Sequence, residues 1–247
     1  MADIKPYTVW DAGTRWFHWI NALCVIALMV VGFAILKSGS LELSNAAKIT
    51  LKTIHAWIGY VFALNLIWRF VWAFFGNRYA RWRAILPGGK GYPKAFRRYV
   101  GAFFSGHPEQ YAGHNPVGRL GVAVLLLLLT VQAVTGLVLA GTDLFLPPIG
   151  HWIAQWVAAP GVAPESLVPY APAMYDEAAY QSMRAFRKAF AVTHLYSFYL
   201  LVAVVVVHVA AVVVTEIREG GSITSAMITG RKILGGRPVD EEPGNHD

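Results

Sequence analysis

The sequence predicts an all-α membrane protein, a bundle of four transmembrane helices. The chain of 247 residues is 56% hydrophobic and 14% charged, whereas an average soluble domain has about 25% charged residues. Four apolar stretches also reach the roughly 20 residues that a helix needs to cross a bilayer. We expect these spans at residues 17–36, 54–75, 118–140 and 190–215, within one integral-membrane domain of residues 1–247.

Lysine and arginine are distributed unevenly among the segments outside these spans. Thirteen lie before the first span, between the second and third, or after the fourth, and six lie in the other two connections. Because positively charged residues favour the cytoplasmic side, we expect both termini and the tail of residues 216–247 in the cytoplasm. The net charge of +7 follows from this topology, so we expect no nucleic-acid partner.

The long connection of residues 141–189 then faces outward. We interpret it as a cap or docking surface, because connections of this length are usually functional. Within it, "HWIAQW" places Trp152 and Trp156 one helical turn apart, which favours a helix lying along the membrane interface. His151 is expected to be an interfacial or surface residue.

Two other features have simple interpretations. In "GHNPVGRLG", Asn115 is a candidate N-cap and Pro116 the first helical residue, so we interpret His114 as part of a helix start. The one cysteine, Cys24, lies in an apolar run and is interpreted as a packing residue. A single cysteine excludes an intrachain disulfide, a Cys-ligated iron–sulfur cluster and a c-type haem attachment.

Four histidines lie within or at the ends of the spans, where polar side chains are costly and by default functional. His194 and His208 are fourteen residues apart, which is close to four turns and about 21 Å of helix. They therefore share one face at opposite depths. His18 begins the first span at the inner level, matching His208, and His55 begins the second span at the outer level, matching His194.

Facing neutral imidazoles are axial haem ligands in helical cytochromes. We therefore predict two stacked, non-covalent b haems, an outer one between His55 and His194 and an inner one between His18 and His208. A zinc site would need its ligands clustered in one coordination sphere. Ion-coupled transporters usually have Asp or Glu within their spans, but the predicted spans contain neither. Room for the macrocycles comes from three glycines, Gly32, Gly59 and Gly136.

Cations near the two levels are candidates for binding haem propionates, with simple interfacial anchoring as the alternative for each arginine. The inner candidates are Arg15, Arg69 and Arg119, and the outer candidates are Lys52, Arg187 and Lys188.

Several motifs resemble the bacterial cytochrome b561 family: "TRWFHW", "IHAWIGY", "RFVWAFFGNRYARW", "GHNPVGRL" and the last two histidines. Within it, "FFGNRYAR", "GHNP" and "SAMITGRK" are most similar to the b-type cytochrome subunit of membrane-bound nickel–iron hydrogenase. The resemblance implies a dihaem protein of the bacterial inner membrane, with His18, His55, His194 and His208 as ligands. It also implies electron transfer between the quinone pool and a periplasmic redox protein, either a hydrogenase or a c-type cytochrome.

Two alternatives belong to other functional classes. A stand-alone oxidoreductase of the cytochrome b561 type would oxidise superoxide and reduce quinone without a protein partner. A non-redox membrane anchor or transporter would use the histidines only to pair with each other, and the purified protein would then show no haem absorption.

Overall fold

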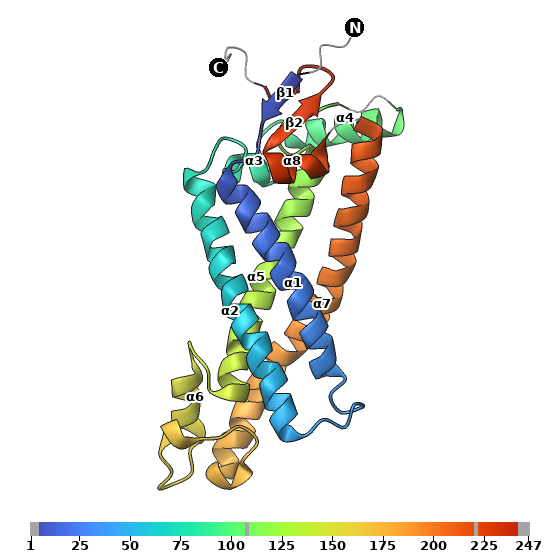
Figure 1. The fold of residues 1–247 in the computed structure, drawn as a ribbon. Coiled ribbons are helices and arrows are strands. Elements are labelled where there is room, and N and C mark those ends of the chain that lie inside the picture. The colour runs from blue at the N-terminus through green and yellow to red at the C-terminus, as the bar shows by residue number, and fades with distance from the viewer. Residues whose placement is uncertain (1–4, 107–108, 220–221, 242–247) are drawn as a thin grey trace. The chain divides into compact units, whose positions relative to one another are not determined.

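The computed structural model describes residues 5–106, 109–219 and 222–241, and most of them are helical. Four helices are long and apolar enough to cross a membrane, which supports the four predicted spans (Figure 1). They are α1 (Ala12–Leu36), α2 (Asn45–Phe75), α5 (Pro116–Leu144) and α7 (Glu177–Glu219). Leu64, Leu127 and Val206 are about two-thirds exposed on them, as lipid-facing side chains are. Cys24 is buried, as predicted.

The spanning helices are longer than predicted. The helix α7 begins at Glu177 instead of residue 190, and α2 begins at Asn45 instead of residue 54. The added stretch "EAAYQSMRAFRKA" is polar but rich in strong helix formers, so the helix continues past the apolar segment that sets the prediction. The connection between α5 and α7 is accordingly residues 145–176, shorter than the predicted 141–189.

Side-chain oxygens cap the starts of all four long helices, and for α7 the Oδ1 atom of Asp176 accepts a hydrogen bond from the Ala179 amide at 2.8 Å. The Oδ1 atom of Asp11 accepts a hydrogen bond from the Thr14 amide at 2.8 Å, just before α1. Ser44 caps α2 in the same way. The Oδ1 atom of Asn115 accepts one from the Gly118 amide at 2.7 Å, and α5 begins at Pro116. The predicted cap and first helical residue of the third span are thus confirmed.

The residues divide into two compact units. The first comprises Met1–Trp19, Ile67–Leu127 and Leu201–Asp247, and the second comprises Ile20–Leu66 and Leu128–Leu200. Each of the four long helices contributes residues to both units. Neither unit is therefore a separate continuous stretch of the chain.

The first unit contains a small sheet that the all-α prediction does not include. The strand β1 (Lys5–Thr8) pairs antiparallel with β2 (Arg231–Leu234), as Figure 1 shows. The segments before the first predicted span and after the last one therefore lie together. Within the predicted tail of residues 216–247, residues 220–221 and 242–247 lie outside the described residues.

Short helices complete the first unit. They are α3 (Trp82–Ile85), α4 (Tyr92–Phe104) and α8 (Ile223–Thr229). A buried cluster of Val9, Trp10, Tyr79, Ala112 and Ala226 joins the N-terminal segment to α8 and to the residues between α2 and α5.

In the second unit, the connection between α5 and α7 folds into a compact cap. It contains α6 (Gly150–Val157) and two short 3₁₀ helices, η1 (Pro164–Ser166) and η2 (Pro172–Met174). Ile153, Val157 and Leu167 are buried against Met183 of α7. The predicted helix of "HWIAQW" is thus present, with Trp152 65% and Trp156 43% exposed. Its position at a membrane interface stays a prediction.

Asp11 connects the start of α1 to the end of α2, and its replacement should destabilise the first unit. Besides capping α1, its carboxylate accepts hydrogen bonds from the Trp72 indole at 3.0 Å and the Asn77 amide at 2.9 Å. We expect Asp11→Ala to lower the free energy of unfolding by about 1–3 kcal/mol, measured by thermal unfolding in detergent. Asp11→Asn keeps an acceptor oxygen and should lose less. An equal loss in both variants would contradict the capping role.

The cap at Asp11 also predicts how the stability of the protein changes with pH. Burial raises the pKa of Asp11, but hydrogen bonds from the Asn77 and Thr14 amides outweigh burial, so the pKa lies below its ordinary value. A carboxyl with a lowered pKa stabilises the folded state fully above its unfolded pKa and loses this contribution as the pH falls through the folded pKa. We therefore expect unfolding temperatures of the wild type to fall more steeply at acidic pH than those of Asp11→Asn.

Candidate functional site

In the second unit, two of the predicted ligands face each other. His55 lies on α2 and His194 on α7, with ring centroids 6.4 Å apart and ring planes at 76°. A metal bound by two histidines lies about 2.0–2.1 Å from each nitrogen, which places the ring centroids roughly 6.3 Å apart when the metal is between them. The observed separation fits a metal shared by the two imidazoles. The Nδ1 atom of His55 is buried without a hydrogen-bond partner among the described residues.

A threonine hydroxyl orients the ring of His194. The Oγ1 atom of Thr135 on α5 lies 2.8 Å from Nδ1 of His194. The same hydroxyl donates its proton to the Val131 carbonyl at 2.6 Å, so its lone pair is left to accept the Nδ1 proton of the imidazole. The opposite ring nitrogen then keeps its lone pair, which is the tautomer that a metal ligand requires. Sequence reasoning missed Thr135, because a hydroxyl bonded within its own helix has no distinctive spacing.

Other α5 residues also contact this turn of α7. The side-chain amide of Gln132 donates hydrogen bonds to the His194 carbonyl and the Ser197 hydroxyl, each at 3.0 Å. A methyl group added at Gly136 would lie 3.4 Å from Cε1 of His194. Polar bonds and a small residue therefore hold the imidazole close to α5.

Two of the predicted glycines in this unit differ in their surroundings. A methyl group added at Gly32 would lie 3.2 Å from Cε1 of His55, tighter than an ordinary contact. One added at Gly59 would meet nothing within 4 Å. The structure thus brings Gly32 against a predicted ligand and leaves open space beside Gly59.

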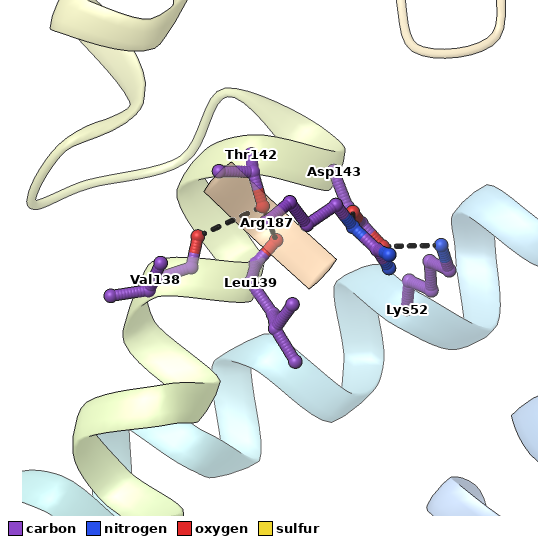
Figure 2. Close-up of polar contacts among 6 residues, drawn as sticks. All are labelled: Lys52, Val138, Leu139, Thr142, Asp143 and Arg187. Atoms are coloured by element: carbon purple, nitrogen blue, oxygen red, sulfur yellow. Dashed lines mark hydrogen bonds and ion pairs between the residues drawn. The ribbon is translucent and has the colours of Figure 1, made fainter. Parts of the chain in front are cut away.

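An ion cluster adjoins this pair of histidines on the same three helices. The Asp143 carboxylate accepts a hydrogen bond from Lys52 Nζ at 2.5 Å and two from the guanidinium of Arg187, one of them at 2.9 Å (Figure 2). Two of the predicted outer propionate partners therefore share one carboxylate, and the third, Lys188, is exposed. Asp143 was missed because the predicted third span ends at residue 140.

In the first unit, His18 on α1 and His208 on α7 lie close enough to interact electrostatically. The Nδ1 atom of His18 is buried and has no hydrogen-bond partner in the part of the chain that the structure describes. His208 is exposed. The predicted inner pair is thus brought into the same unit.

The three predicted inner cations use their guanidinium groups differently. Arg69 is 4% exposed and donates to the Ala80 carbonyl at 3.0 Å, but its Nη1 is buried without a partner among the described residues. Arg15 donates to the Ile228 carbonyl and keeps a similarly unpartnered Nε. Arg119 donates to the carbonyl oxygens of Leu86 and Arg83.

His114 lies beside this site, where the sequence predicted only a helix start. Its ring packs on Trp10 with centroids 4.7 Å apart. Burial, together with interactions with Lys232, Arg69 and His208, lowers the pKa of His114 to about 3. The imidazole is therefore neutral at pH 7. By contrast, His151 is exposed and contacts Gln155, as its prediction as a surface residue requires.

Among residues 5–106, 109–219 and 222–241, no three or more His, Cys, Asp or Glu residues form a group suited to a metal ion.

Comparison with known proteins finds similarity to b-type cytochromes. The family model of prokaryotic cytochrome b561 matches residues 9–230. The chain is 26% identical over 242 residues to a probable Ni/Fe-hydrogenase B-type cytochrome subunit of Cupriavidus necator, covering 92% of this chain and 87% of that protein. It is 28% identical over 235 residues to a protein of the same description from Bradyrhizobium diazoefficiens, covering 91% and 85%. No solved structure matches it significantly.

The Thr135 hydroxyl should be needed for cofactor retention in the second unit. Thr135→Val leaves the Nδ1 proton of His194 buried without an acceptor, and loss of such a partner typically weakens metal affinity by about 10–100-fold. We expect Thr135→Val to lose haem from this site and Thr135→Ser to retain it, measured as haem per polypeptide after dilution.

A matched control lies on the same helix. Thr142 is equally buried, and its hydroxyl bonds to the Val138 and Leu139 carbonyls but not to a histidine (Figure 2). Thr142→Val should keep its haem. The orienting role of Thr135 is wrong if both valine variants behave alike.

Proposed function

The chain belongs to the prokaryotic cytochrome b561 family, and on that premise we propose that it is the membrane subunit that carries electrons for a quinone-linked oxidoreductase complex. It holds two b haems, an outer one bound by His55 and His194 and an inner one bound by His18 and His208. Each bound haem supplies a reversible one-electron centre. The protein supplies the ligands, the spacing and the electrostatic surroundings.

The geometry of the outer pair is the observation that carries this proposal. The ring separation of 6.4 Å fits two imidazoles that share one metal, and Thr135 leaves the other ring nitrogen of His194 available as a ligand. Gly32 approaches His55 and Gly136 approaches His194. A larger residue at either position would press on the imidazole.

The inner site is supported by the polar atoms that the protein leaves unused. The Nδ1 atom of His18, Nε of Arg15 and Nη1 of Arg69 are all buried without a partner in the described residues. Unpaired polar groups of this kind are costly inside a protein, and haem propionates are suitable acceptors for the two arginines. Arg119 is the weakest of the three propionate candidates, because its hydrogen bonds already go to carbonyl oxygens.

The outer propionates have a comparable set of partners. Lys52 and Arg187 bring two positive charges to the single carboxylate of Asp143, so the cluster can accept another anion. A propionate between the two cations would leave Asp143 as their shared anchor. Lys188 remains an exposed candidate.

We place the chain in the bacterial inner membrane with both termini in the cytoplasm. Its redox partner on the periplasmic side is a nickel–iron hydrogenase or a c-type cytochrome, and the cap of residues 145–176 is the surface that the partner contacts. The names of the relatives favour hydrogenase. With such a donor, electrons run inward and reduce quinone, whereas with a cytochrome c they run outward from quinol.

Removing one inner ligand should separate the two haems. We expect His208→Ala to lose the inner haem and quinone-linked activity while the outer haem remains. The protein as purified should contain two b haems per polypeptide by pyridine haemochrome assay, and the variant one. His151→Ala, which removes an exposed histidine, is the control and should keep both. No haem in the wild type after expression with ample haem would overturn the proposal, and loss of both haems in His208→Ala would overturn the pairing.

A further inference from the structure

The first unit contains a cavity of about 470 Å³. One wall is the glycine-rich loop of residues 88–91 with the start of α4, and a second wall comes from the segment of residues 111–119 that leads into α5. His114 lies in this second wall. The volume falls within the range typical of small-molecule sites.

Aromatic and small apolar side chains make up much of the lining. Tyr79, Tyr92 and Tyr111 line the cavity together with Ala84 and Ala95. Such a slot suits a flat, uncharged ring. Pockets for small molecules are typically lined in this way, with few polar groups placed to orient the ligand.

Most polar groups of the lining already have partners in the protein. The Tyr92 hydroxyl donates to the Pro116 carbonyl at 2.8 Å. Arg119 donates to the Leu86 carbonyl, and the Asp240 carboxylate accepts from the Ala112 and Gly113 amides.

His114 differs from these groups. Its Nδ1 is buried and has no hydrogen-bond partner among the described residues, and its half-buried ring contributes to the wall. The imidazole therefore has unused hydrogen-bonding capacity beside the cavity.

His114 also connects the cavity to the proposed inner haem. It interacts electrostatically with His208 and Arg69, both assigned to that haem, as well as with Arg119 across the cavity wall. A ligand that contacts His114 therefore lies next to the inner redox centre. This position suits a substrate that exchanges electrons there.

We propose that this cavity binds the head ring of a quinone, with His114 hydrogen-bonded to one of its carbonyl oxygens and tyrosine rings along its faces. The inference rests on the proposed function and assigns its quinone site. Arg78 and Lys90 also line the cavity, so an anionic phospholipid headgroup is the competing ligand. The negative charge of Asp240 and the contact of Arg78 with the Tyr79 ring favour the uncharged quinone.

The test uses the haem-loaded full-length chain in detergent and a short-tailed azido-quinone as photoaffinity probe. We expect labelled peptides from residues 84–95 and 111–119, with labelling competed by unmodified short-tailed quinone. His114→Phe keeps an aromatic ring for packing on Trp10 but removes both ring nitrogens. It should weaken quinone binding on the order of tenfold or more, with two haems per polypeptide retained.

A second variant changes Gly91, in the other part of the cavity lining. A side chain at Gly91 would start in open space, with nothing within 4 Å of its first carbon, so Gly91→Phe should fill the cavity without disturbing the haem ligands. It should also weaken probe binding. It decides the question alone if His114→Phe does not fold or loses haem. His151→Phe, on α6 in the second unit, is the matched control and should bind the probe normally.

Three results would overturn the inference. The first is probe labelling confined to other segments, and the second is unchanged binding of the probe to Gly91→Phe. The third is labelling that anionic phospholipid competes and quinone does not, and that is lost in Lys90→Gln. The last result would assign the cavity to a lipid headgroup. If the wild type holds two haems that quinol reduces but these variants bind quinone normally, only the site assignment fails. A wild type without haem would instead remove the proposed function itself.

Discussion

The hydrocarbon core of a bilayer offers no water, so every polar group placed there must find its partner within the protein or its cofactor. Helices satisfy this requirement for the backbone, and the four long apolar helices follow from it. The histidines are the exceptions that need an explanation. His194 meets the requirement through Thr135 on one ring nitrogen, whereas Nδ1 of His18 and Nδ1 of His55 are buried without a partner among the described residues.

The same constraint explains where charge is found. Asp143 lies at the end of α5 and forms ion pairs with both Lys52 and Arg187. These ion pairs offset most of the free-energy cost of burying the three charges. In the first unit, the buried Lys232 ammonium donates to the Tyr111 and Gly113 carbonyls. Arg69 instead keeps an unpaired N–H group. Among the described residues, the buried polar atoms without a partner include Nδ1 of His18 and His55 and guanidinium nitrogens of Arg15 and Arg69.

Much of the fold could be predicted from the sequence because the physical signals are local. Apolar length predicts the spans, and Asn115–Pro116 predicts a helix start, which the structure confirms. Spacing along one helix predicts that His194 and His208 share a face of α7, and the depths of the spans predict that His55 pairs with His194, whose ring lies 6.4 Å from that of His55.

The rest depends on contacts between distant segments, which a single sequence does not encode locally. The polar start of α7 has no apolar signal, and β1 and β2 are each four residues long. Thr135 acts through a partner on another helix. His114 was interpreted as part of a helix start, because Asn115 and Pro116 beside it form one. Sequence reasoning thus predicted the ligands but missed the residues that orient them or connect them to a cavity.

Pairing of β1 with β2 has a consequence for biosynthesis. The first strand leaves the ribosome long before its partner, so its backbone groups stay unpaired until residues 231–234 have been made. An unpaired strand edge is a template for association with other chains. A product truncated before Arg231 would therefore present this edge permanently.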